Sequence, residues 1–106
     1  MTAATPVLDT LIDINTASIA HTRLMPRELM IARLAALVAV DAPPMSYLVN
    51  AGAATDSGIT EQDVQDILIA VAPVVGTTKV VSAGGNLMRA LGFAIAVAED
   101  ESATGM

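Results

Sequence analysis

Apolar residues recur at helical spacing along most of the chain, and no segment alternates strictly between apolar and polar positions as a β-strand would. A first helix is predicted to begin at Thr5 and Pro6, with threonine as the N-cap and proline at the first helical position, and to end near His21. Pro26 begins a second helix that is apolar on nearly all sides. We expect this helix to be buried in the core or in a contact between subunits.

Prolines and glycines divide the middle of the chain into two further helices. Residues 41–44 contain two consecutive prolines, which break the second helix and begin the third. Gly58 stands where the glycine after a helix C-terminus would stand, and residues 60–63 supply an N-cap and early carboxylates for a fourth helix. Pro73 is expected to end or kink that helix, and residues 76–78 to form a turn.

The C-terminal part is predicted to be helical, with interruptions at its glycines. A helix is expected over residues 79–91, where the small residues at 84–85 would let two helices approach closely. Gly92 is expected to separate it from a last helical stretch over residues 93–98. The tail, residues 99–106, is expected to be solvated and frayed.

The length and composition of the chain indicate which fold class these helices form. A chain of 106 residues suffices for one domain and is too short for two, and 54% apolar against 15% charged residues excludes a disordered segment. With one Tyr, one Phe and no Trp, the core must consist of small aliphatic side chains. We predict one compact all-α domain of five or six helices over residues 1–106, with its helical core at about 6–98. The surplus of apolar surface predicts a homo-oligomer.

Charge and cysteine content exclude several classes of function. The net charge is −6 and the few cations are scattered, so nucleic acid is not an expected partner. The chain has no cysteine, which excludes disulfides and thiol-based redox chemistry. No apolar stretch reaches the roughly 18 residues of a membrane span, and the N-terminus lacks the features of a signal peptide. We therefore expect no membrane partner and a cytoplasmic location.

Three short motifs follow one another within residues 20–98: PREL at 26–29 before an aliphatic run, GIT at 58–60 before an acidic helix, and GTT at 76–78. In these motifs the chain resembles the carboxymuconolactone decarboxylase superfamily, which also holds the alkylhydroperoxidase-D-like proteins. The family has a proline at the position of Thr78. The resemblance implies an all-helical subunit that assembles into a homotrimer or homohexamer, with a small-molecule pocket near the subunit contacts.

At the positions that carry the family's chemistry, this chain departs from the active members. The family histidine falls on Asn50, and the two cysteines of the peroxidase branch fall on Pro43 and Ser46. Because both steps of thiol-dependent peroxide reduction need ionised sulfur, alkylhydroperoxidase activity is not expected. Glu28 matches the glutamate of the family's RE motif, and the resemblance assigns it a role in proton transfer.

Glu28 and Arg33, both on the second helix, have structural as well as functional interpretations. Glu28 lies in the first turn, where a carboxylate stabilises the helix dipole whatever the function, so it is either a cap or a catalytic acid or base. Arg33 lies within an aliphatic turn, and a buried guanidinium must be paired or must bind an anion. An internal salt bridge, within the chain or across a subunit contact, is one interpretation of Arg33, and substrate binding is the other.

Tyr47 and Asn50 are three positions apart and share a helical face, with Ser46 beside them. They could present a phenol, an amide and a hydroxyl to one substrate, or they could cap the Pro-Pro turn and join helices. No cofactor or metal is predicted, because His21 is the single histidine and has no carboxylate at ligand spacing. Asp63 and Asp66 are interpreted as a solvated stripe.

Two functions fit these observations. In the first, the protein binds a small organic molecule in an intersubunit pocket and acts as a cofactor-independent lyase or isomerase, with Glu28 as acid or base and Tyr47, Asn50, Ser46 and Arg33 binding the substrate. In the second, it is a catalytically inactive family member that serves as a ligand-binding or scaffolding homo-oligomer. A pocket lined by Glu28 would support catalysis, whereas a solvent-facing Glu28 would support the second function.

Overall fold

The computed structural model describes residues 5–104 and the side chains of residues 5–90. Within these limits the chain forms five helices and no strand, which confirms the all-α prediction. The helices follow in the order α1 (Pro6–His21), α2 (Pro26–Ala39), α3 (Pro44–Asp56), α4 (Glu61–Val75) and α5 (Thr77–Thr104).

The helix boundaries follow from local chemistry, as the turn between α3 and α4 shows. Gly58 has a φ of 84°, and its N–H donates to the carbonyl of Thr55, while the N–H of Ile59 donates to the carbonyl of Ala54. This pair of bonds is a Schellman motif, which a glycine at the left-handed position permits. The side chain of Ile59 is buried and anchors the turn in the core.

At the other end of the chain the structure corrects the sequence prediction. The predicted break at Gly92 is wrong, because α5 continues through that position as one helix to Thr104. A single glycine inside a helix lowers the stability of the helix by about 1 kcal/mol relative to alanine but keeps its backbone hydrogen bonds. The residues with high helix propensity on either side are therefore sufficient for the helix to continue. The predicted frayed tail is therefore helical from residue 99 to Thr104, and residues 105–106 lie outside the described part of the chain.

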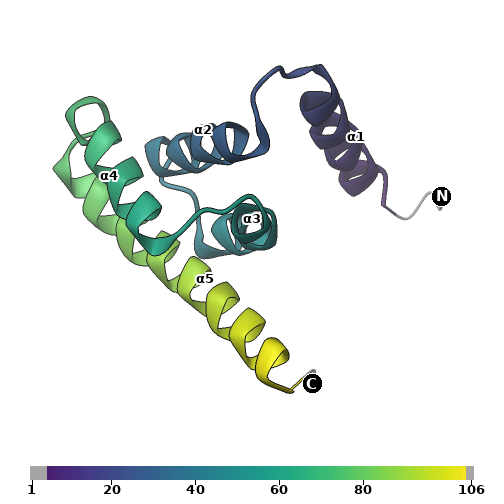
Figure 1. Cartoon of the computed structure of the whole chain (residues 1–106). Coiled ribbons are helices and arrows are strands. Elements are labelled where there is room, and N and C mark those ends of the chain that lie inside the picture. The colour runs from purple at the N-terminus through teal and green to yellow at the C-terminus, as the bar shows by residue number, and fades with distance from the viewer. Residues whose placement is uncertain (1–4, 105–106) are drawn as a thin grey trace.

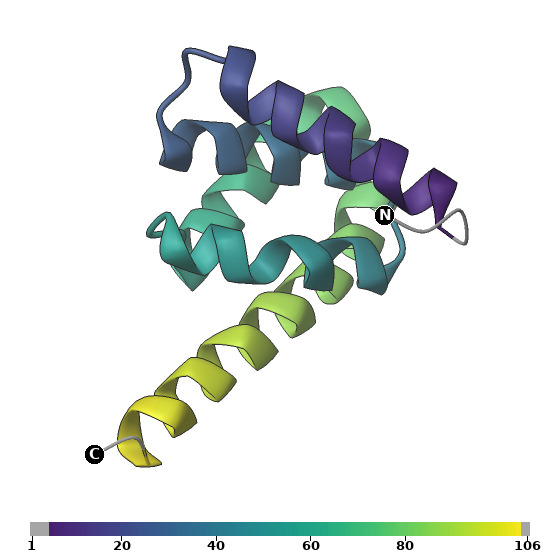
Figure 2. The same cartoon turned by 90° about the vertical axis from the view of Figure 1, so that its right-hand side faces the viewer.

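Helices α2 to α5 pack together into one body (Figure 1), in which α3 and α4 lie against α5 and α2 contacts the other three. Its core is aliphatic, with Leu34, Val38, Val64 and Leu87 fully buried around the single tyrosine, Tyr47. A Cβ at Gly84 would lie 3.3 Å from Cδ1 of Leu68, so this glycine lets α4 and α5 approach closely, as predicted. The C-terminal half of α5 projects beyond the body (Figure 2).

Helix α1 lies apart from this body and is joined to α2 by an extended connection (Figures 1 and 2). Its backbone makes no close contact with another helix, and none of its residues is buried. The exposed fractions of its large apolar residues are 73% for Val7, 55% for Leu8, 56% for Leu11, 52% for Ile12, 61% for Ile14 and 51% for Ile19. The apolar face of α1 is therefore largely uncovered within one chain.

Candidate functional site

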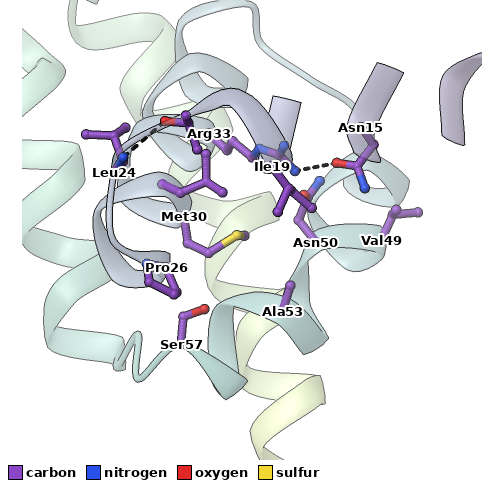
Figure 3. A pocket seen from close by; sticks show the side chains of 12 residues that line it. Asn15, Ile19, Leu24, Pro26, Met30, Arg33, Val49, Asn50, Ala53 and Ser57 are labelled. Carbon is purple, nitrogen blue, oxygen red and sulfur yellow. Dashed lines mark hydrogen bonds between the residues drawn. The ribbon is translucent and has the colours of Figure 1, made fainter. Parts of the chain in front are cut away.

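A cleft lies between α1, α2 and α3. Its volume is about 570 Å³, within the range of small-molecule sites, and Figure 3 shows the side chains that line it. The lining is mostly apolar. The residues are Asn15, Ile19, Thr22, Leu24, Pro26, Leu29, Met30, Arg33, Val49, Asn50, Ala53 and Ser57.

Arg33 is the only charged residue among those that line the cleft. Its Nη1 donates to Oδ1 of Asn15 at 2.5 Å and its Nη2 to Oγ of Ser18 at 3.1 Å, so the guanidinium tethers α1 to α2. Both partners are neutral. The ion pair found in the described part of the chain joins Arg27 to Asp63, so the internal salt bridge considered for Arg33 does not form with any of the described side chains.

Asn50 lies at the same end of the cleft as Arg33 (Figure 3). It is half-buried on α3, and its Nδ2 donates to the backbone carbonyl of Ser46 at 2.8 Å. This bond is local to its own helix and uses one of the amide's polar groups. Asn50 therefore lies beside the cleft while its amide nitrogen is bonded to its own helix.

The walls of the cleft come from three different segments. Leu29 and Met30 supply the α2 side, Val49 and Ala53 the α3 side, and Ile19 the α1 side. Met30 is nearly fully buried, and its side chain points into the middle of the cleft (Figure 3). Because thioether chains are flexible and polarisable, a methionine at this place allows the cleft to adapt to different apolar ligands.

Tyr47 and Ser46 do not line the cleft. Tyr47 is fully buried in the core, and its hydroxyl has no hydrogen-bond partner among the described residues. Burial, and then the negative charge of Asp41, raise the pKa of Tyr47 above the ordinary value. The structure therefore does not bring Tyr47 and Asn50 together at one site, although they share a helix.

Glu28 also lies away from the cleft lining, at the exposed first turn of α2. Its Oε1 accepts a hydrogen bond from the backbone N–H of Met25 at 2.9 Å. The carboxylate thus satisfies one of the free amide groups at the helix start, which is the structural interpretation of this residue. Within one chain, Glu28 is a cap.

Arg27, the other residue of the RE motif, joins α2 to the start of α4. Its Nη1 donates to the carbonyl of Gly58 at 3.0 Å and to Oδ2 of Asp63 at 2.7 Å, and its Nη2 donates to Oδ1 of Asp63 at 2.6 Å. Asp63 also accepts from the N–H of Thr60 and forms a capping box with it. The Arg27 hydrogen bond, and then that from Thr60, hold the pKa of Asp63 well below its usual range.

The interpretation of Asp63 as part of a solvated stripe is therefore wrong, because its carboxylate joins α2 to α4. Asp66 is exposed, and its Oδ1 accepts a hydrogen bond from Nε2 of Gln62.

No group of three or more histidines and carboxylates that could hold a metal ion occurs in the described part of the chain. None of the helices found there is long and apolar enough to cross a membrane.

Sequence reasoning missed the contribution of α1 to the cleft. Asn15 and Ser18 interrupt the apolar face of the first helix, between Leu11 and Ile19. Polar residues inside such a face indicate a polar partner opposite, which is a signal that the pattern did contain. Their partner proved to be Arg33, which needed the tertiary structure to identify.

We compared the chain with protein-family models, curated proteins and solved structures, and none of the three comparisons found a match.

Proposed function

We propose that the protein is a carboxymuconolactone decarboxylase-like helical protein that binds a small organic molecule in the cleft between α1, α2 and α3, as a homotrimer or homohexamer. The observation that carries the proposal is a mostly apolar cleft of about 570 Å³ that holds one charged side chain, Arg33. Apolar walls with a few polar groups are typical of small-molecule sites. The order of the PREL, GIT and GTT motifs on five helices supports the family assignment.

The position of Glu28 favours binding without catalysis, the second of the two functions. Glu28 is exposed and caps α2. The residues that line the cleft include no aspartate, glutamate or histidine, so none of them exchanges protons readily near neutral pH. A lyase or isomerase reaction would need an acid or base from outside this lining. The lack of cysteine argues against thiol-dependent hydroperoxide turnover in either case.

A neutral apolar dye tests the cleft as a binding site. Nile red fluorescence is expected to show saturable binding to the wild-type protein and about tenfold weaker binding to Ala53→Trp, whose indole would occupy the space beside Asn50. Gln65→Trp is the matched control, because it places the same side chain on the exposed face of α4. Equal binding to all three proteins would contradict the proposal.

Light scattering tests the oligomer. The uncovered apolar face of α1 supports an assembly in which other copies cover it, since contiguous exposed apolar surface commonly marks an interface. We expect a mass three or six times that of the 10.8 kDa chain. A stable monomer at micromolar concentration would exclude the oligomeric part of the proposal and leave the cleft to be judged by dye binding.

A further inference from the structure

We propose that the cleft selects an amphipathic anion, with a carboxylate bound by the Arg33 guanidinium and an apolar chain lying along Leu29, Met30 and Ala53. This inference rests on the proposed binding function of the cleft and adds the chemical class of the ligand. It depends on three features of the site: the partners of Arg33, the nature of the walls, and the net charge of the chain.

Among the described residues, the guanidinium of Arg33 has neutral hydrogen-bond partners only. The hydrogen bonds to Asn15 and Ser18 use two of its five N–H donors and leave its positive charge without a carboxylate in the described part of the chain. A half-buried charge is costly unless an opposite charge compensates it. The planar fork of a guanidinium fits the two oxygens of a carboxylate, so an anionic ligand would satisfy both needs.

The walls define the rest of the ligand. From Arg33 the cleft continues along Leu29, Met30 and Ala53 to Ser57, and it holds no second charge. An ion that is small and fully polar would leave these apolar walls in water, whereas an alkyl or aryl chain would cover them. The ligand that complements both parts therefore has one anionic end and an apolar body.

The negative net charge of the chain allows a preference for anionic ligands to be distinguished from non-specific electrostatic attraction. The chain carries −6, so non-specific electrostatic attraction would favour a cationic amphiphile over an anionic one. Preference for an anion would run against that long-range field and would have to come from a local positive group. Arg33 is the only such group that lines the cleft.

The test compares three probes with the same alkyl chain, octanoate, octan-1-ol and octan-1-amine, by isothermal titration calorimetry on the wild-type protein at pH 7. We expect octanoate to bind about 10- to 100-fold more tightly than octan-1-ol, as for a hydrogen bond to a charged group, and the amine to bind least. This order needs no variant. Octanoate and octan-1-ol binding equally would overturn the anion preference and leave the proposed binding function intact, whereas the absence of binding by all three probes would count against both.

Variants then locate the preference. Arg33→Gln should remove the preference for octanoate over octan-1-ol, and any affinity lost because α1 is held less firmly should be the same for both probes. Arg33→Lys should keep a weaker preference for octanoate. Lys79→Gln, which removes an exposed cation of α5, should leave the binding of both probes unchanged. A preference that persists in Arg33→Gln would overturn the assignment. So would an Arg33→Gln protein that changes oligomeric mass without changing ligand preference, because Arg33 would then pair with a carboxylate of another copy.

Discussion

Helix α1 and the body of α2 to α5 are built from the same residue types at the same helical spacing but have opposite environments. In the body, Leu34, Val64 and Leu87 are fully buried, whereas Leu11 and Ile14 on α1 have exposed fractions of 56% and 61%. The body is held by its apolar core and by the Arg27–Asp63 ion pair at its surface, while the polar contacts of Arg33 hold α1 to the body. An amphipathic pattern thus shows that a face needs a partner and does not identify that partner.

The difference also suggests how each region moves. The free energy needed to open a segment locally depends on its buried apolar contacts, and α1 has no buried residue. We therefore expect α1 to open more readily than the body and to do so without unfolding it. Because α1 forms one wall of the cleft, its docking would set whether a ligand can be enclosed.

The largest expected effect separates the two regions directly. Leu34→Ala, in the core, should lower the free energy of unfolding by about 2–5 kcal/mol, whereas Leu11→Ala, on α1, should lower it by about 0.5 kcal/mol or less in dilute solution. Urea denaturation of both variants measures the difference. If copies of the chain cover α1, the decrease in the free energy of unfolding caused by Leu11→Ala should grow with protein concentration. The decrease caused by Leu34→Ala should not. Equal losses at low concentration would show that α1 belongs to the core.

The next effect concerns the Arg27–Asp63 ion pair, which holds the body together from its surface. Because the pKa of Asp63 is lowered in the folded state, its contribution is present above the ordinary aspartate pKa of about 4 and is lost as the pH falls below it. Asp63→Asn should therefore lower the midpoint of thermal unfolding at pH 7, by less than Leu34→Ala, and the difference from wild type should shrink below about pH 4. Asp66→Asn is the control and should match the wild type throughout.

Within the core of the body, Tyr47 carries a buried hydroxyl that has no hydrogen-bond partner among residues 5–90. Tyr47→Phe should raise the free energy of unfolding by up to about 1 kcal/mol, because it removes an unsatisfied polar group and keeps the ring. Since the pKa of Tyr47 is raised by folding, the protein should lose stability as the pH rises above about 10, and Tyr47→Phe should not show this loss. Tyr47 is the only tyrosine, so ultraviolet absorbance follows its ionisation directly. Ionisation at the ordinary pKa in the folded protein would contradict this account.

The smallest expected effect is confined to α1. Asn15→Ala removes one of the two contacts of Arg33 with that helix, and should speed hydrogen exchange of the α1 amides while the urea midpoint of the body stays unchanged. Thr16→Ala is the control, because the hydroxyl of Thr16 donates to the carbonyl of Ile12 within its own helix. Unchanged exchange in Asn15→Ala would show that Arg33 does not hold α1 in place.

Much of the fold could be predicted because helix ends depend on neighbouring residues. Pro26 and Pro44 at first helical positions, Gly58 after α3 and the capping box of Thr60 and Asp63 all act within a few residues of one another. The break expected at Gly92 was wrong, because one glycine costs too little to interrupt a long helix. The family assignment and the oligomer stay predictions.

The candidate site was predicted only in part. Arg33 and Asn50 line the cleft, whereas Glu28, Ser46 and Tyr47 do not. Tyr47 and Asn50 differ by about 60° around the axis of α3, since a helix turns about 100° per residue, and this angle separates a side chain in the core from one in the cleft. Helical periodicity predicts that two residues share a face, but it does not show that one side of this face meets the core and the other side meets the cleft.

By itself, the sequence determined that the chain is helical, where most of its helices begin and end, and that it lacks thiol chemistry, because these properties depend on composition and on near neighbours. Only the tertiary structure decided that Arg33 contacts Asn15 and Ser18 in place of a carboxylate, that Glu28 caps a helix, and that α1 keeps its apolar face uncovered. These outcomes depend on how distant helices are placed relative to one another. That placement follows from the packing of the whole core, which no local pattern encodes.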